Sequence, residues 1–136
     1  MKNYDFLMER AKAATEHSYS PYSGFKVGAA LLLKDGSIYD GCNIENAAFT
    51  PTVCAERVAV FKAVSEGKRV GDFEAIAVVA NKDGDFVYVA PCGVCRQVLR
   101  EFCEDDFLIV MLGEDSLIAE KLSAILPRSF SPSDLG

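Results

Sequence analysis

The sequence predicts an α/β protein in which a mixed five-stranded sheet is sandwiched between helices. Three observations support this fold class. Amphipathic helical segments alternate with short apolar runs, and an Asp-Gly pair lies between two of those runs, which is typical of a hairpin. The resulting order of helix, hairpin, helix, strand, helix and strand suits a sheet with helices on its faces. A chain of 136 residues suffices for one compact domain, so we predict a single domain over residues 1–136.

The first half of the chain predicts a helix, a hairpin and a second helix. Residues 3–17 have the spacing of an amphipathic helix, and its inward face would carry Phe6, Leu7, Ala11 and Ala14. A loop rich in turn-forming residues leads to a strand at 25–33. Asp35-Gly36 predicts a tight turn to a returning strand at 37–42. A helix is then predicted over 54–66, because Gly67 follows it.

The second half predicts the centre of the sheet and one further helix. An apolar strand is expected at 73–80, followed by a turn and a short apolar extension at 86–90. A cysteine-containing turn opens a helix over 96–103, and a buried strand follows at 107–112. The pattern at 117–126 fits a short strand and then a helical turn.

Composition and charge exclude several classes of function. The net charge is -6 and the pI is about 4.8, so charge alone does not favour binding to nucleic acids or anionic membranes. The charged N-terminal segment lacks the apolar run of a signal peptide, and we expect no membrane segment. The five cysteines, an odd number, indicate a metal site in a reducing compartment, and we therefore expect a cytoplasmic protein.

The cysteine spacing predicts a zinc site with one open position. Cys92 and Cys95 are separated by two residues, which lets both sulfurs face one ion from a tight turn, and Cys54 offers a third thiol. Each thiol would lie near the start of a predicted helix, where the helix dipole favours a thiolate. Glu56 could move protons of a water molecule at the open position. A C-x-E followed by P-C-x-x-C is the thiol form of the zinc deaminase signature.

A second group of residues could form a pocket for a sugar and a base. Asn43 and Glu45 are two residues apart, so in an extended chain they face the same side, and an amide beside a carboxylate suits sugar hydroxyls. Phe25 is either a core residue or the aromatic wall of a pocket beside the strand end. The same motifs occur in ordinary loops, so the spacing alone is weak support.

The chain resembles the small, homotetrameric cytidine deaminases with a three-cysteine zinc site over almost its full length. The resemblance rests on five stretches, which are Tyr19–Ser23, Phe25–Ala30, Gly41–Ala48, Cys54–Arg57 and Pro91–Gln97. It implies zinc-dependent hydrolysis of cytidine and 2'-deoxycytidine to uridine and 2'-deoxyuridine with release of ammonia, in pyrimidine salvage. Residues 49–53 and 85–90 are less typical, and the resemblance assigns them no role.

The resemblance also implies roles around the metal. One Zn²⁺ per subunit would be held by Cys54, Cys92 and Cys95 and would lower the pKa of water. Glu56 would pass protons from that water to ring N3 and to the departing amine. Arg57 is similar to a family arginine that hydrogen-bonds the ligand sulfurs, although the residue type alone also fits an ordinary surface arginine.

For the substrate, the resemblance implies that Asn43 and Glu45 bind a sugar hydroxyl and that Phe25 contacts the base. The backbone of Ala55 would hold the amine of the base. Phe130, in the C-terminal tail, is similar to an aromatic residue that covers the base in a neighbouring subunit. A homotetramer with shared active sites is therefore expected.

Three alternatives remain open at this stage. A structural zinc module would need a fourth protein ligand, which only Cys42, Cys103 or His17 could provide, although we expect the two cysteines to be small buried side chains and the histidine to end the first helix. A deaminase of another small molecule, such as a nucleoside-like antibiotic or a modified base, would share the metal motif. A nucleic-acid deaminase is disfavoured by the acidic charge.

Overall fold

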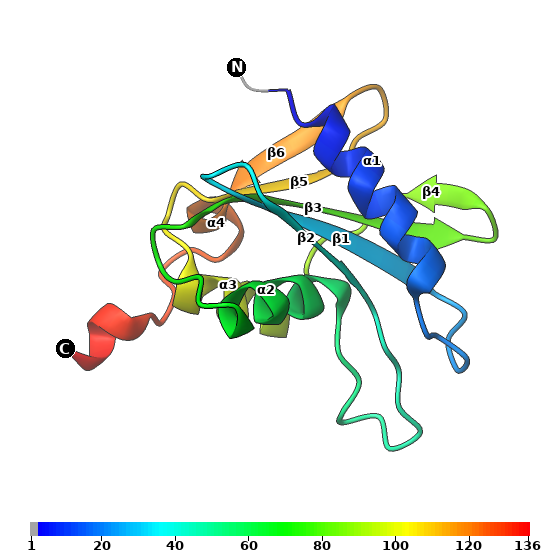
Figure 1. The fold of residues 1–136 in the computed structure, drawn as a ribbon, viewed down its shortest axis with the longest axis horizontal. Coiled ribbons are helices and arrows are strands. Elements are labelled where there is room, and N and C mark those ends of the chain that lie inside the picture. Colours follow the sequence, from blue (N-terminus) through cyan, green and yellow to red (C-terminus); the bar gives the residue numbers. More distant parts are fainter. Residues whose placement is uncertain (1–2) are drawn as a thin grey trace.

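The computed structural model describes residues 3–136 and is built on one mixed sheet of six strands (Figure 1). Five strands follow the order β2-β1-β3-β5-β6, and β4 pairs with β3 outside this path. β3 and β5 are parallel, and the other pairs are antiparallel. The strands are β1 (Lys26–Leu33), β2 (Ile38–Cys42), β3 (Phe73–Lys82), β4 (Asp85–Val87), β5 (Leu108–Leu112) and β6 (Leu117–Lys121).

Helices cover both faces of the sheet, as the sequence predicted (Figure 1). On one face lies α1 (Asp5–Ala14), which continues into a short 3₁₀ turn at Thr15–His17. On the other face lie α2 (Ala55–Ser65), α3 (Gly93–Phe102) and the single turn α4 (Leu122–Ile125). A second 3₁₀ turn, Pro132–Leu135, ends the chain. Within residues 3–136, no helix has the length and apolar character needed to cross a membrane.

The sixth strand, β4, was not among the five predicted strands. β3 pairs with β5 only at residues 75–77, so its last residues extend past β5 and have an open edge. Asp83 adopts a positive φ of 54° and is followed by Gly84, and this turn folds the chain back onto that edge. Phe86 then pairs with Asn81. The sequence predicts only a short apolar extension here, because three residues are too few to show a strand pattern.

The inward face of α1 was predicted with one error. Its buried residues are Leu7, Met8, Ala11 and Ala14, whereas the side chain of Phe6 is 48% exposed. Residues 7, 11 and 14 define the buried stripe, and position 8 lies closer to its centre than position 6 because successive residues are rotated by about 100°. The flexible thioether of Met8 therefore packs against the sheet in place of the ring of Phe6.

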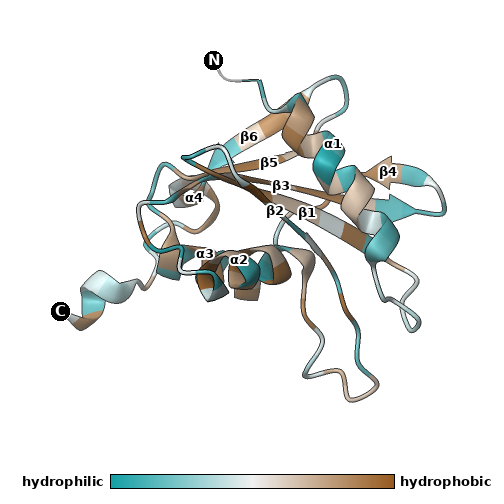
Figure 2. Ribbon diagram, in the orientation of Figure 1, coloured by the Kyte–Doolittle hydropathy of each residue, from teal (hydrophilic) through white to brown (hydrophobic). Residues whose placement is uncertain are grey.

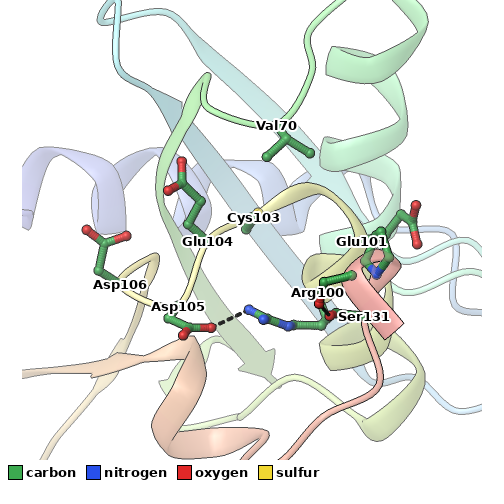
Figure 3. A pocket seen from close by; sticks show the side chains of 10 residues that line it. Val70, Arg100, Glu101, Cys103, Glu104, Asp105, Asp106 and Ser131 are labelled. Atoms are coloured by element: carbon green, nitrogen blue, oxygen red, sulfur yellow. Dashed lines mark hydrogen bonds and ion pairs between the residues drawn. The ribbon is translucent and has the colours of Figure 1, made fainter. Parts of the chain in front are cut away.

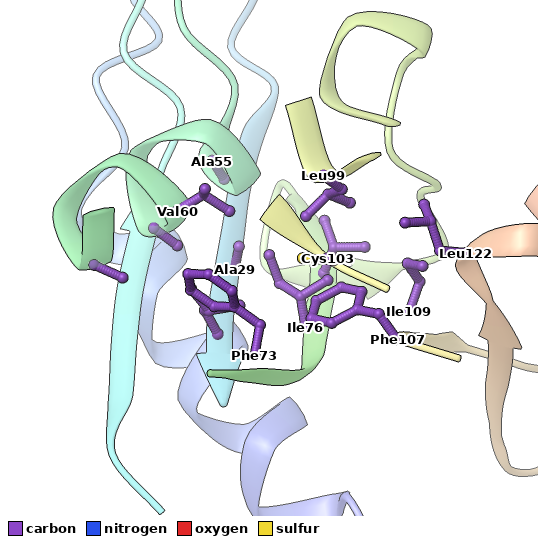
Figure 4. Packing of buried hydrophobic residues seen from close by; sticks show 14 of the residues in the cluster. Ala29, Ala55, Val60, Phe73, Ile76, Leu99, Cys103, Phe107, Ile109 and Leu122 are labelled. Carbon is purple, nitrogen blue, oxygen red and sulfur yellow. The ribbon is translucent and has the colours of Figure 1, made fainter. Parts of the chain in front are cut away.

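The core has one layer on each side of the sheet. The layer under α2 and α3 is drawn in Figure 4, where Phe73, Phe107 and Leu122 pack with aliphatic side chains from the sheet and the helices. The layer under α1 consists largely of alanine, leucine and valine. The central strands are accordingly the most hydrophobic part of the ribbon in Figure 2. Because β3 is buried on both faces, it reads as a continuous apolar run, and it fixes the position of the helices on either side.

Candidate active site

The three predicted ligand cysteines converge where two helices begin. Cys54 is the residue before α2, Cys92 is the residue before α3, and Cys95 lies in the first turn of α3. The Sγ atoms of Cys54 and Cys92 are 3.8 Å apart, and those of Cys92 and Cys95 are 3.5 Å apart. All three sulfurs lie within 4.8 Å of one another. The positive ends of two helix dipoles therefore face the same sulfur cluster.

A close contact between β2 and α2 fixes the position of Cys54. A Cβ atom on Gly41 would lie 2.3 Å from the carbonyl oxygen of Ala55 and 2.7 Å from the backbone nitrogen of Ala59. Only glycine leaves room for the first turn of α2 to lie this close to the strand. The strand thereby holds the start of α2 in a fixed position against the sheet.

The sulfur cluster fits a zinc ion with one position left open. Sulfur atoms on a tetrahedral Zn²⁺, with Zn–S bonds of about 2.3 Å, lie about 3.8 Å apart. Among residues 3–136, the cluster contains three potential ligands and no fourth. His17 and Cys42 line a separate cavity of about 230 Å³. Cys103 lines another, of about 500 Å³, beside the ion pair between Arg100 and Asp105 (Figure 3).

The surroundings shift the pKa values of two of the thiols in opposite directions. Hydrogen bonding from Cys95 lowers the pKa of Cys54 to about 5, and a hydrogen bond from Arg57 contributes in the same direction. The donor, Cys95, has its pKa raised by the Cys54 thiolate and by burial. A divalent cation would stabilise both thiolates, so binding of a metal at this site is coupled to loss of a proton.

Glu56 lies in the first turn of α2, two residues after Cys54, and its side chain is almost completely inaccessible. Its exposed fraction is 4%. Burial raises the pKa of the Glu56 carboxyl group to about 7, and the negative charge on Cys54 adds to this effect. A carboxyl group with a pKa near neutrality can both accept and donate a proton at physiological pH.

Arg57 lies beside the sulfur cluster. Its Nη2 atom is 3.5 Å from the Sγ of Cys54. Its Nε is buried and has no hydrogen-bond partner within the described residues. A guanidinium group in this position draws negative charge from the sulfurs.

Asn43 and Glu45 are connected to the metal cluster through the backbone. Ile44, between them, exchanges two backbone hydrogen bonds with Val53, the residue before Cys54. On its other side, the segment pairs with Tyr19. The two predicted sugar-binding residues are thus held in a short three-stranded arrangement that leads directly to a zinc ligand.

The side chain of Asn43 is buried and extensively hydrogen-bonded. Its Oδ1 accepts from the hydroxyl of Ser18 at 2.5 Å and from the backbone N–H of Val27 at 2.9 Å. Its Nδ2 donates to the carbonyl of Phe25 at 2.8 Å. Both oxygen lone pairs are therefore used, and one N–H of the amide remains for another partner. Asn43 and Phe25, both predicted to contact substrate, are joined by this bond.

Sequence reasoning missed the residues that hold these two side chains. Ser18 binds Asn43, and the backbone and hydroxyl of Ser23 bind Glu45. The only signal for them in the sequence is the spaced serines of the loop before β1, and this composition predicts no more than a turn. Cys42, expected to be buried, is instead partly accessible, because it lies at the end of the edge strand β2 and lines a cavity.

The remaining predicted residues occupy different environments. Ala55 is completely buried, and Phe25 is 38% exposed. Phe130 is 59% exposed, and its backbone carbonyl accepts a hydrogen bond from the side chain of Gln97 on α3. In Figure 1, the C-terminal segment projects from the molecule well away from the start of α2. An aromatic side chain in this segment is available for contact with another molecule.

Comparison with known proteins agrees with this geometry. Residues 1–111 match the family model of the cytidine and deoxycytidylate deaminase zinc-binding region. A cytidine deaminase from Sporosarcina psychrophila is 51% identical over 130 residues, which cover 95% of this chain and 92% of that protein. A crystal structure of a cytidine deaminase from Burkholderia pseudomallei has a TM-score of 0.86 and 42% identity, covering 95% of this chain and 100% of that one.

The relatives differ in their named substrates. A blasticidin-S deaminase from Bacillus cereus is 31% identical over 131 residues, covering 91% of each chain. Relatives of this chain thus include deaminases named for more than one substrate. With a family model matched over most of the chain and relatives of high identity over nearly all of it, this chain belongs to the zinc-binding cytidine and deoxycytidylate deaminase family.

Proposed function

We propose that the protein catalyses the zinc-dependent hydrolysis of cytidine and 2'-deoxycytidine to uridine and 2'-deoxyuridine, with release of ammonia. One observation carries this proposal: the buried carboxyl group of Glu56 lies in the helical turn that follows Cys54, beside the three sulfurs. Within residues 3–136, those sulfurs have no fourth protein ligand beside them. A structural zinc site normally closes its fourth position with a protein ligand, whereas a catalytic site keeps it open.

The proposed chemistry requires proton transfers that Glu56 can perform. When bound to Cys54, Cys92 and Cys95, zinc supplies a Lewis acid that lowers the pKa of water. Glu56 takes a proton from the attacking water and delivers it to N3 of the ring while C4 gains the oxygen. The same carboxyl group then takes the proton of the new C4 hydroxyl group and passes it to the amine, and the C4–N bond breaks to release ammonia. Its raised pKa supports this double role.

The substrate contacts follow from the free hydrogen-bonding groups near the cluster. The remaining N–H of Asn43 donates to a sugar oxygen, and the Glu45 carboxylate accepts from a sugar hydroxyl. Phe25, which is partly exposed, would contact the base, and the backbone of Ala55, which is completely buried within this chain, would hold the amine of the base when substrate is bound. An amide donor next to a carboxylate acceptor can satisfy both functions of a hydroxyl group.

We further propose a cytoplasmic homotetramer that acts in pyrimidine salvage, with Phe130 of one subunit covering the base in another. The exposed ring of Phe130 supports this assembly, since a large apolar side chain in water gains nothing until a partner covers it. The cytoplasm suits the site because thiolate ligands must remain reduced to bind zinc. The net charge of -6 supports a free nucleoside, rather than a nucleic acid, as the substrate.

The function is tested by following the ultraviolet difference spectrum when the purified protein is mixed with cytidine, 2'-deoxycytidine or blasticidin S. We expect the absorbance change of deamination with both nucleosides, and one zinc per chain by metal analysis. If the protein deaminates only blasticidin S, then blasticidin S and not a nucleoside is its substrate. Protein containing zinc but inactive on all three would contradict the proposal.

A further inference from the structure

The loop before β1 encloses the carboxylate of Glu45. One carboxylate oxygen, Oε1, accepts hydrogen bonds from the backbone N–H groups of Tyr22, at 2.9 Å, and Ser23, at 3.1 Å. The other, Oε2, accepts a hydrogen bond from the hydroxyl of Ser23. Three donors from one loop, more than 20 residues away in the sequence, therefore converge on this group.

Only one oxygen of the Glu45 carboxylate has a lone pair left for another donor. A carboxylate oxygen offers two lone pairs, so the two N–H groups occupy Oε1 completely. Oε2 uses one lone pair for Ser23 and keeps one. A hydroxyl group arriving from outside can therefore bind only to Oε2, the atom whose direction the Ser23 hydroxyl fixes.

The Ser23 hydroxyl also connects two parts of the candidate pocket. Besides donating to Glu45, its Oγ accepts the backbone N–H of Phe25 at 3.0 Å. One hydroxyl thus links the residue proposed to hold the sugar with the residue proposed to contact the base. This places a limit on how far the two can move relative to each other.

The loop has a conformation suited to this task. Gly24 adopts a positive φ of 69°, and its N–H bonds back to the carbonyl of Ser20 at 2.9 Å. Because glycine has no Cβ atom, it adopts this left-handed conformation without steric cost and closes the turn. The hydrogen bonds from Ser23 and Tyr22 also lower the pKa of the Glu45 carboxyl group, so it is a charged acceptor at neutral pH.

We propose that Ser23 is a positioning residue for sugar recognition, which aims the free lone pair of Glu45 Oε2 at a hydroxyl of the nucleoside sugar. The inference rests on the proposed nucleoside deamination and deepens it by naming what sets its sugar selectivity. Ser23 does not contact the reacting atoms. Its effect should therefore appear in the binding of substrates that carry hydroxyls at C2' or C3' of the sugar ring and disappear for a substrate that keeps only the 5'-hydroxyl.

The experiment compares cytidine with 2',3'-dideoxycytidine, which has no hydroxyl on the sugar ring, in the zinc-loaded enzyme. In Ser23→Ala, we expect the ratio of kcat/KM for cytidine to that for dideoxycytidine to fall about tenfold, mainly through KM for cytidine. Ser23→Thr keeps a hydroxyl and should restore most of the ratio.

Ser37→Ala is the matched control. Ser37 Oγ donates to Oδ1 of Asp35 at 2.6 Å in the turn between β1 and β2, so it is also a serine bound to a carboxylate in an exposed loop. This substitution should leave the ratio unchanged. If Ser23→Ala lowers the melting temperature strongly, Ser23→Cys takes its place, because a thiol is similar in size and a weaker donor.

The results distinguish a failure of the role proposed for Ser23 from a failure of the proposed deaminase function. If kcat/KM in the Ser23 variants falls equally for both substrates, or falls for neither, Ser23 has no positioning role. The proposed deaminase function is unaffected by that result as long as the wild type deaminates cytidine. A zinc-loaded wild-type enzyme that deaminates neither substrate would overturn the proposed function itself, and the inference with it.

Discussion

Arg57 donates from Nη2 to the Sγ of Cys54 over 3.5 Å, and this contact places a positive charge against the sulfur cluster. Three thiolates around Zn²⁺ carry a net charge of about -1, which makes the metal a weaker Lewis acid than one held by neutral ligands. The guanidinium group and the starts of α2 and α3 offset that charge. A contact from outside the three sulfur ligands would thus tune the reactivity of a zinc ion bound there.

Replacing Arg57 by alanine should lower kcat about 10- to 100-fold while KM changes little, because the thiolates would then donate more charge to the metal. Steady-state kinetics on protein with measured zinc content tests this. Arg69→Ala is the control, since Arg69 is exposed and bonds only to backbone carbonyls nearby through its side chain. An unchanged kcat at full zinc occupancy would show that Arg57 does not tune the site.

Glu56→Gln should retain zinc and fold but lose turnover by a factor of about 10² to 10⁴, because an amide cannot accept and return a proton. The substitution preserves size and removes only the acid–base function. Glu66→Gln, at the exposed C-terminal end of the same helix, is the matched control and should be fully active. Rates near those of the wild type in Glu56→Gln would remove this residue from the mechanism.

Much of the fold could be predicted because the deciding signals are local. The spacing of apolar residues in α1 and α2, and Asp35-Gly36 between two apolar runs, each lie within one element. β4 could not be predicted, because it depends on where β5 stops pairing along β3. The exposure of Phe6 was missed for a similar reason, since Met8 competes with it for the same place on the sheet.

The residues of the candidate site also fall into two groups, those that short sequence spacings predict and those that depend on distant parts of the chain. The cysteines and Glu56 are found from short spacings, because two helix starts carry all four residues. Ser18 and Ser23 could not be found, because their partners, Asn43 and Glu45, are 25 and 22 residues away. The pairing of β1 with β2 and the bridge between Tyr19 and Ile44 bring the two segments together. A serine in a loop gives no sign of which distant side chain it will hold.

Asn43→Ala and Glu45→Ala should both weaken nucleoside binding with zinc retained, but they should differ in their effects on stability. Asn43 bonds to Ser18, Val27 and Phe25, and only 9% of its surface is exposed. Its removal leaves buried partners unsatisfied and should cost about 1–3 kcal/mol in the free energy of unfolding, in addition to raising KM.

Glu45 is more accessible, so Glu45→Ala should mainly raise KM. Urea denaturation and steady-state kinetics on both variants measure the two effects separately. Unchanged kcat/KM for cytidine in both variants would place the sugar elsewhere. Equal losses of stability would contradict the assignment of Asn43 as the more structural of the two.

Phe130→Ala should keep its zinc and fold but raise KM or lower kcat, if this ring covers the base in a neighbouring subunit. The ring is 59% exposed within its own chain, so its removal costs that chain little. Burial against a neighbour would contribute about 1.5–3 kcal/mol, and this is lost in the variant. Gln97 holds the backbone of Phe130 and not its ring, so the direction of the tail should survive the substitution. Val70→Ala, which also truncates an apolar side chain that is 59% exposed and lies outside the metal site, is a control for loss of surface area alone.

Mixing Phe130→Ala with Glu56→Gln provides the sharper test of the shared site. Each variant alone lacks one component in every active site. If a site takes Glu56 from one subunit and Phe130 from another, random mixed tetramers contain some sites in which both components are intact. The activity of the mixture should then exceed the sum of the separate activities and increase as subunits exchange. Mass spectrometry establishes that exchange has occurred. Complete exchange without a gain in activity, or full activity of the wild type as a monomer at nanomolar dilution, would show that each chain builds its active site alone.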